Sequence, residues 1–155
     1  MRDDKRFPPQ VTAKGEELGY APDWLPLLFL VPSLQVAWAE GFMQVAEQKA
    51  ILRFAASIGV KPDHPAYEKL LEWFDERPED EFFSRSVEDL GELLAGVTAK
   101  QAARLRSMLQ FSCVEVAHAS GDIGLLRGRS NIRREERDAL QSIGARLGLS
   151  PAYVV

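Results

Sequence analysis

Four acidic residues in this sequence have the side-chain type and the spacing that could form a cation-binding site. Glu40 and Glu47 flank a glycine turn in the first half of the chain, and Asp122 and Glu136 flank a second glycine-containing segment. Hard cations such as calcium and magnesium prefer carboxylate oxygens, together with the backbone carbonyls that a glycine turn can offer. The sequence therefore supports the hypothesis of a divalent-cation site formed by Glu40, Glu47, Asp122 and Glu136.

A purely structural role is the alternative for two of these residues. Glu47 and Glu136 both fall in the first turn of an expected helix, where a glutamate can bond backbone amides and complement the helix dipole. The aspartate-rich loop of a dedicated calcium site does not occur in the sequence. The two hypotheses differ in geometry, because a cation site requires the carboxylates to converge within about 5 Å of one point.

Basic residues are concentrated at one place, after the second glycine segment. Arg127, Arg129 and Arg133 lie there, followed by two further arginines. Such a patch could dock a phosphate, an anionic lipid headgroup or an acidic protein partner. Because Glu135 and Asp138 dilute the positive charge, a solvated and salt-bridged helix face is the alternative interpretation.

Other kinds of chemistry find little support. The histidines, His64 and His118, lack the HxxxH spacing and the neighbouring cysteines of a zinc site. Cys113 lies in an apolar stretch. An enzyme that uses His118 and Asp122 as an acid and base pair is a weak alternative, which requires a pocket that contains both. We therefore expect no catalytic activity.

A duplicated helical segment must position the glutamates. Residues 47–62 align without a gap on residues 136–151, and each copy is led by an apolar helix that ends at a glycine. Gly59 is expected to stop the first copy as a left-handed residue. The duplication predicts two pseudo-symmetric helix–turn–helix repeats.

The rest of the chain also reads as helical, because no segment shows the alternation of a strand. Thr98 and Gln101 form the signature of a capping box at the start of a long helix. Asp23 is expected to cap a helix over residues 23–41, in which Pro32 predicts a kink or a break. We expect an all-α, compact bundle of about 6–8 helices.

Composition indicates one domain with a polar extension. We expect residues 1–21 to form a flexible N-terminal arm and residues 22–155 to form a single helical domain. The net charge of −4 argues against nucleic acid as a partner. The apolar run of residues 24–38 is shorter than the roughly 20 residues that a membrane span needs. We expect a cytoplasmic protein, for which membrane association would be peripheral.

The three tryptophans are expected to contribute mainly to the core. Trp24, Trp38 and Trp73 lie at the spacing of inward-facing helix positions. The alternative places Trp24 or Trp73 at the rim of a groove.

The segment Ala39-Glu40-Gly41-Phe42-Met43-Gln44-Val45-Ala46-Glu47 resembles the repeated signature of the TerB-like family. In that signature an acidic residue and a glycine close one helix, a hydrophobic residue follows, and a glutamate opens the next helix. The likeness recurs around Glu136. The chain departs from the pattern in having Glu40 where the family usually has an aspartate, and Ser120 at the matching place of the second repeat.

The resemblance implies an all-helical scaffold without catalytic chemistry. The family is named for the tellurite-resistance protein TerB, and similar domains occur in the N-terminal part of a membrane-anchored J-domain co-chaperone. We therefore expect a binding or scaffold module that has a protein partner in a stress-response or membrane-associated assembly. The alternative is a divalent-cation sensor that uses the acidic residues of the repeat turns, with calcium or magnesium as the cation.

Overall fold

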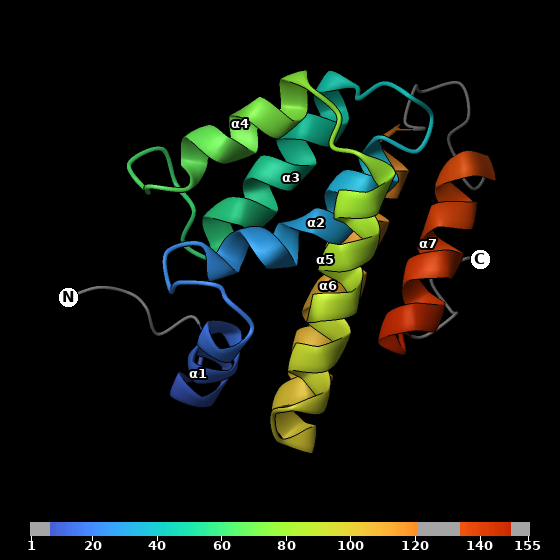
Figure 1. Cartoon of the computed structure of the whole chain (residues 1–155). Coiled ribbons are helices and arrows are strands. Elements are labelled where there is room, and N and C mark those ends of the chain that lie inside the picture. Colours follow the sequence, from blue (N-terminus) through green and yellow to red (C-terminus); the bar gives the residue numbers. More distant parts are fainter. Residues whose placement is uncertain (1–6, 121–133, 150–155) are drawn as a thin grey trace.

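The computed structural model of the chain describes residues 7–120 and 134–149, which form seven α-helices (Figure 1). In chain order they are α1 (Pro9–Glu17), α2 (Leu25–Ala37), α3 (Val45–Ser57), α4 (Tyr67–Asp75), α5 (Asp80–Ala95), α6 (Ala99–Ser120) and α7 (Arg134–Leu147). These described residues contain no β-strand. The prediction of an all-α bundle is confirmed.

Helix α2 is the centre of the bundle. All of its residues except Gln35 are buried, which is typical of a helix that neighbours cover on every side. It contacts α3, α5, α6 and α7. In Figure 1, α4 lies on one side of the molecule and α7 on the other. The apolar run that the sequence places at residues 24–38 is therefore the core of this fold.

The predicted break at Pro32 does not occur, because α2 continues through this residue. Proline removes one backbone donor from a helix. The neighbouring Ser33 hydroxyl donates a hydrogen bond back to the carbonyl oxygen of Leu30, at 3.0 Å. At the start of the helix Trp24 takes the N-cap position that we expected for Asp23.

Part of the expected N-terminal arm is packed into the domain. Residues 9–17 form α1, in which Val11 is fully buried, and the ring of Phe7 lies 4.8 Å from that of Phe29 between centroids. Gly15 allows the close approach of α2, since a Cβ there would meet Leu25 Cδ1 at 2.8 Å. Few apolar residues occur in this segment: the buried residues of α1, Val11 and Gly15, are four apart and so share one helix face, and Phe7 packs on the core just before the helix begins. This packing corrects the prediction of a flexible arm over residues 7–21; residues 1–6 lie outside the described part.

Local signals at the helix ends agree with the structure. Thr98 Oγ1 accepts a hydrogen bond from the Gln101 amide, and Gln101 Oε1 accepts one from the Thr98 amide, each at 3.1 Å. Gly59, after α3, has a φ of +95°, and Gly148, after α7, has a φ of +75°. The capping box and the left-handed Gly59 are thus confirmed. The pseudo-symmetry of the two helix pairs stays a prediction.

Helix α7 packs against α2, α5 and α6. The Nε of Arg106 on α6 donates a hydrogen bond to the carbonyl oxygen of Leu147 at 2.8 Å, which satisfies a carbonyl at the end of α7. Within the described residues, no helix is both long enough and apolar enough to cross a membrane.

Candidate functional site

The two glutamates of the duplicated segment meet inside the protein. Glu47 lies in the first turn of α3 and Glu136 in the first turn of α7. Their side chains are 1% and 0% exposed, and a hydrogen bond joins the two carboxyl groups. The tertiary structure therefore brings together two of the four carboxylates that the sequence singled out.

This bond requires a proton, because two ionised carboxylates can only accept hydrogen bonds. Burial raises the pKa of Glu47 most, and the hydrogen bond to Glu136 raises it further. The negative charges of Glu136 and Glu40 act in the same direction, whereas the hydrogen bond from the Gln44 backbone lowers this pKa. The net result is a pKa of Glu47 well above its usual range, so the pair retains a proton at neutral pH.

The structural role predicted for Glu47 is also present. The backbone amide of Gln44 donates a hydrogen bond to Glu47 Oε1 at 2.8 Å, which is the part of a capping box in which the side chain reaches back. Glu47 Oε2 is buried, and no backbone or side-chain donor of the described residues bonds to it. One oxygen of Glu47 therefore caps α3, and the other is buried without a backbone or side-chain donor from the described residues.

The remaining predicted cation ligands are not gathered here by the described part of the chain. Glu40 is near enough for its charge to raise the pKa of Glu47, while Asp122 lies outside the described residues. Those described residues include no group of three or more histidine, cysteine, aspartate or glutamate side chains that could hold a metal ion. The two buried carboxyl groups of Glu47 and Glu136, which we refer to as the carboxyl pair, could supply part of the oxygen ligands that a hard cation needs.

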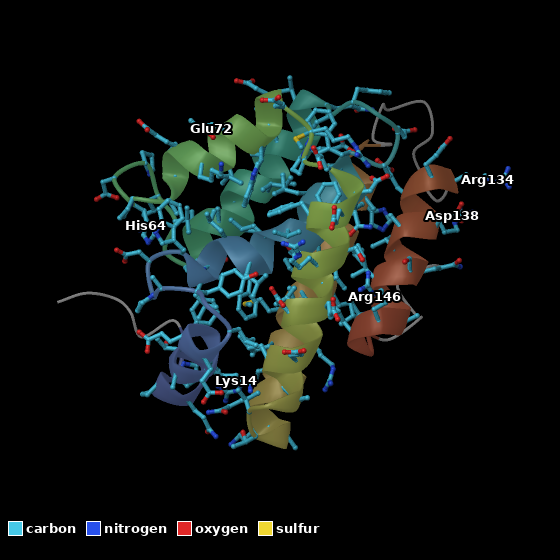
Figure 2. All side chains as sticks on the ribbon, in the orientation of Figure 1. Lys14, His64, Glu72, Arg134, Asp138 and Arg146 are labelled. Carbon is cyan, nitrogen blue, oxygen red and sulfur yellow. The ribbon has the colours of Figure 1, made fainter. Side chains whose placement is uncertain are left out.

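The basic patch predicted at Arg127, Arg129 and Arg133 lies entirely outside the described residues. Figure 2 shows Arg134 and Asp138 on the outer side of α7. His64 lies on the other side of the molecule in that view, and its Nδ1 accepts a hydrogen bond from the Ala66 amide at 3.0 Å. His64 is therefore part of a turn and does not join the carboxyl pair.

Residues 41–45, which end the connection between α2 and α3 and include the first residue of α3, display two large apolar side chains to solvent. Phe42 is 52% exposed and Val45 64% exposed. The turn is fixed at its start by the hydrogen bond that the Gly41 amide donates to the Trp38 carbonyl oxygen at 2.9 Å, and at its end by the hydrogen bond from the Gln44 amide to Glu47. We refer to residues 41–45 as the apolar turn. The sequence marks this segment only by its resemblance and its acidic residues, which do not predict exposed apolar side chains.

A pocket of about 270 Å³ lies among α2, α4 and α5. Aromatic side chains line it, among them Trp24 and Trp73, with aliphatic side chains of α2 beside them. Lys69, Ser86 and Tyr20 also line it, but almost none of the surface that faces the pocket is polar. Trp24, which is 42% exposed, lies at a groove as the alternative placed it, whereas Trp73 both lines the pocket and packs against the core, and Trp38 is buried as expected.

Sequence analysis did not predict this pocket. Its walls come from three helices and from Tyr20, whose hydroxyl donates a hydrogen bond to Asp89 Oδ2 on α5 at 2.6 Å. The only signal in the sequence is the run of aromatic residues in the segments that became α4 and α5. That signal does not tell a filled core from an open pocket, because both need apolar side chains at helical spacing.

No protein-family model, curated protein or solved structure matches the chain. The likeness to the TerB-like signature therefore rests on the quoted residues alone. The features of the molecule that bear on function are the carboxyl pair, the apolar turn and the pocket.

Proposed function

We propose that this chain is a non-catalytic helical binding module and that a protein partner docks on the apolar turn. The exposure of Phe42 and Val45 on a fixed turn is the observation that carries this proposal. Covering apolar surface contributes roughly 25 cal/mol per Å² to association. A turn that is already ordered loses little conformational entropy when a partner covers it.

The setting of this binding follows from the resemblance to the TerB-like family. The quoted signature runs from residue 39 to residue 47 and so contains the whole apolar turn. We accordingly propose a cytoplasmic module in a stress-response or membrane-associated assembly. The partner surface lies on the segment that carries the likeness.

Affinity capture with quantitative mass spectrometry tests the proposal. The bait is the full chain, compared with a double variant, Phe42→Ser with Val45→Ser, and with a matched control, Phe111→Ser, which removes a 65% exposed phenylalanine from α6. We expect the double variant alone to lose specific partners while it unfolds at the wild-type temperature. Equal recovery of partners by all three baits would overturn the proposal.

A second candidate function, a divalent-cation sensor, is favoured by the meeting of Glu47 with Glu136. Calcium or magnesium would be held by these two carboxylates with Glu40 and Asp122, and would supply a fixed positive charge between α3 and α7 in place of the shared proton. The test is the unfolding temperature in millimolar calcium, magnesium, manganese or zinc, against a chelator. Binding raises that temperature in the wild type but not in Glu47→Gln; no rise in the wild type excludes the sensor.

A further inference from the structure

We propose that the pocket among α2, α4 and α5 binds a medium-chain carboxylate, such as a fatty acid of about eight to ten carbons. The alkyl chain would fill the pocket and the carboxylate would bond to the ammonium group of Lys69. None of the pocket residues belongs to the carboxyl pair or the apolar turn. The inference is therefore independent of the function proposed above.

The chemistry of the wall selects an alkyl chain. Nearly all of the surface that faces the pocket is apolar, with aromatic side chains such as Trp73 and Phe82 next to aliphatic side chains of α2. The hydroxyl group of Tyr20 already donates its hydrogen to Asp89. A sugar or nucleotide would lose its water here without gaining enough hydrogen bonds in return, because desolvating a polar group without a partner is costly. An alkyl chain carries no such cost.

The size of the pocket limits the length of that chain. Sites for drug-sized ligands measure roughly 300–1,000 Å³, so a pocket of about 270 Å³ suits a smaller molecule. A water-sized group occupies roughly 30 Å³, and a methylene group is of similar size. The volume therefore corresponds to about nine such groups, and a longer chain would extend into solvent.

The charge at the wall selects the head group. Lys69 is the charged residue among those that line the pocket. Because almost none of the lining surface is polar, its alkyl stem faces the pocket and its ammonium group lies at the mouth, where it favours an anion over a cation or a neutral head. Its Nζ lies 3.3 Å from Glu72 Oε1, but these side chains are 45% and 67% exposed. An ion pair exposed to that degree contributes little. Since an ammonium group has three donors, Lys69 can bond to a ligand carboxylate as well.

The walls are held in place before any ligand arrives. Tyr20 is tied to α5 by its 2.6 Å hydrogen bond to Asp89. The indole nitrogen of Trp38 donates to the backbone carbonyl of Trp73 at 2.9 Å, which fixes α4 against the end of α2. The rings of Trp73 and Phe82 contact each other with centroids 5.3 Å apart. A preformed pocket of this kind avoids the cost of ordering its side chains on binding.

Calorimetric titration of the full chain with decanoate below its micelle concentration, and with decanol below its solubility limit, tests both parts of the proposal. Wild type is compared with Lys69→Met and with Lys100→Met, a matched loss of an exposed lysine at the start of α6. We expect Lys69→Met to weaken decanoate binding roughly tenfold and to leave decanol binding unchanged, as the loss of one charge-assisted bond predicts. Lys100→Met should behave like wild type.

Nuclear magnetic resonance identifies the place of binding. Decanoate should shift the indole signal of Trp24 and the methyl signals of Leu28, which line the pocket, and leave those of Ile143 on α7 in place. Across carboxylates of six to sixteen carbons, affinity should rise up to about ten carbons and then level off. The proposal is overturned if decanoate does not bind, if only micelles bind, or if Lys69→Met weakens decanoate and decanol equally. It is also overturned if the pocket signals shift with protein concentration alone, because a second copy of the chain would then be the occupant.

Discussion

At the scale of single residues, the carboxyl pair combines two roles that sequence analysis treated as alternatives. Glu47 caps α3 through Oε1, and its carboxyl group also bonds to that of Glu136. Both side chains are buried, so neither has the water that would stabilise its charge. A retained proton removes one of the two negative charges. This explains how the carboxyl groups of Glu47 and Glu136 can lie next to each other in the core.

Replacing Glu47 with glutamine should change the pH dependence of stability. In the folded protein the pKa of Glu47 is raised above its unfolded value, so the folded state holds more protons between those two values. The stability from this group is complete below about pH 4.5, and falls as pH rises from there towards the folded pKa, by at most about 1.4 kcal/mol per pH unit. Glu47→Gln should remove this slope, because its amide can accept from Gln44 and donate to Glu136 without titrating.

Urea unfolding at a series of pH values measures this effect. Near pH 4.5 the variant and the wild type should have similar free energies of unfolding, and at pH 8 the variant should be the more stable. The matched control is Glu115→Gln, which changes an exposed glutamate on α6 and should follow the wild-type curve. Parallel curves for the wild type and Glu47→Gln would show that the pair does not retain a proton.

At the scale of elements, α7 is held at both ends by other helices. Its first turn contributes Glu136 to the bond with α3, and its last turn receives the hydrogen bond from Arg106 on α6. Gly148 follows that last turn with a φ of +75°, a conformation that side chains rarely adopt. The docking of α7 therefore depends on groups at its ends as well as on its buried apolar face.

Two glycine-to-alanine changes should have opposite effects on the free energy of unfolding. Gly91 lies inside α5, where a Cβ would find only the carbonyl oxygen of Arg146, at 3.9 Å. Gly91→Ala should stabilise the protein by about 0.5–1 kcal/mol, because alanine is the better helix former. Gly148→Ala should destabilise it by about 1–2 kcal/mol, because the backbone is left-handed there and a Cβ would lie 3.3 Å from Arg106 Nε. Thermal and urea unfolding measure both, and a shift of the same sign would contradict this account of α7.

At the scale of the whole molecule, the N-terminal segment belongs to the single core of the described residues. Phe7 and Val11 are buried together with residues of α2, α3, α5, α6 and α7. Helix α1 also contacts α5, and Tyr20 extends this packing to the wall of the pocket. Removing this segment would expose the core and change the pocket at the same time.

Truncating Phe7 measures how much this packing contributes. Phe7→Ala should lower the free energy of unfolding by about 3 kcal/mol, because it leaves a cavity beside Phe29 and removes an aromatic contact. Phe111→Ala makes the same chemical change at a side chain that is 65% exposed and should cost no more than about 0.5 kcal/mol. Equal losses in chemical unfolding would mean that residues 7–20 are not part of the cooperative core.

The sequence by itself determined the all-helical class and several of the helix ends, but not α1 or the start of α2. The capping box at Thr98 and the left-handed Gly59 could both be predicted, because each signal depends on residues a few positions apart. The first turn of α3 was equally readable, including the glutamate that caps it. Helical periodicity and caps are local, so they need no knowledge of what the helix packs against.

Only the tertiary structure decided what these helices bring together. The burial of Phe7, the meeting of Glu47 with Glu136 and the pocket beside Lys69 each join segments that are distant in the chain. Such contacts depend on how helices of similar apolar character pack against one another, and packing is set by the shapes of many side chains at once. The duplicated glutamates marked where α3 and α7 begin, and the packing of α7 on the bundle made them a buried pair.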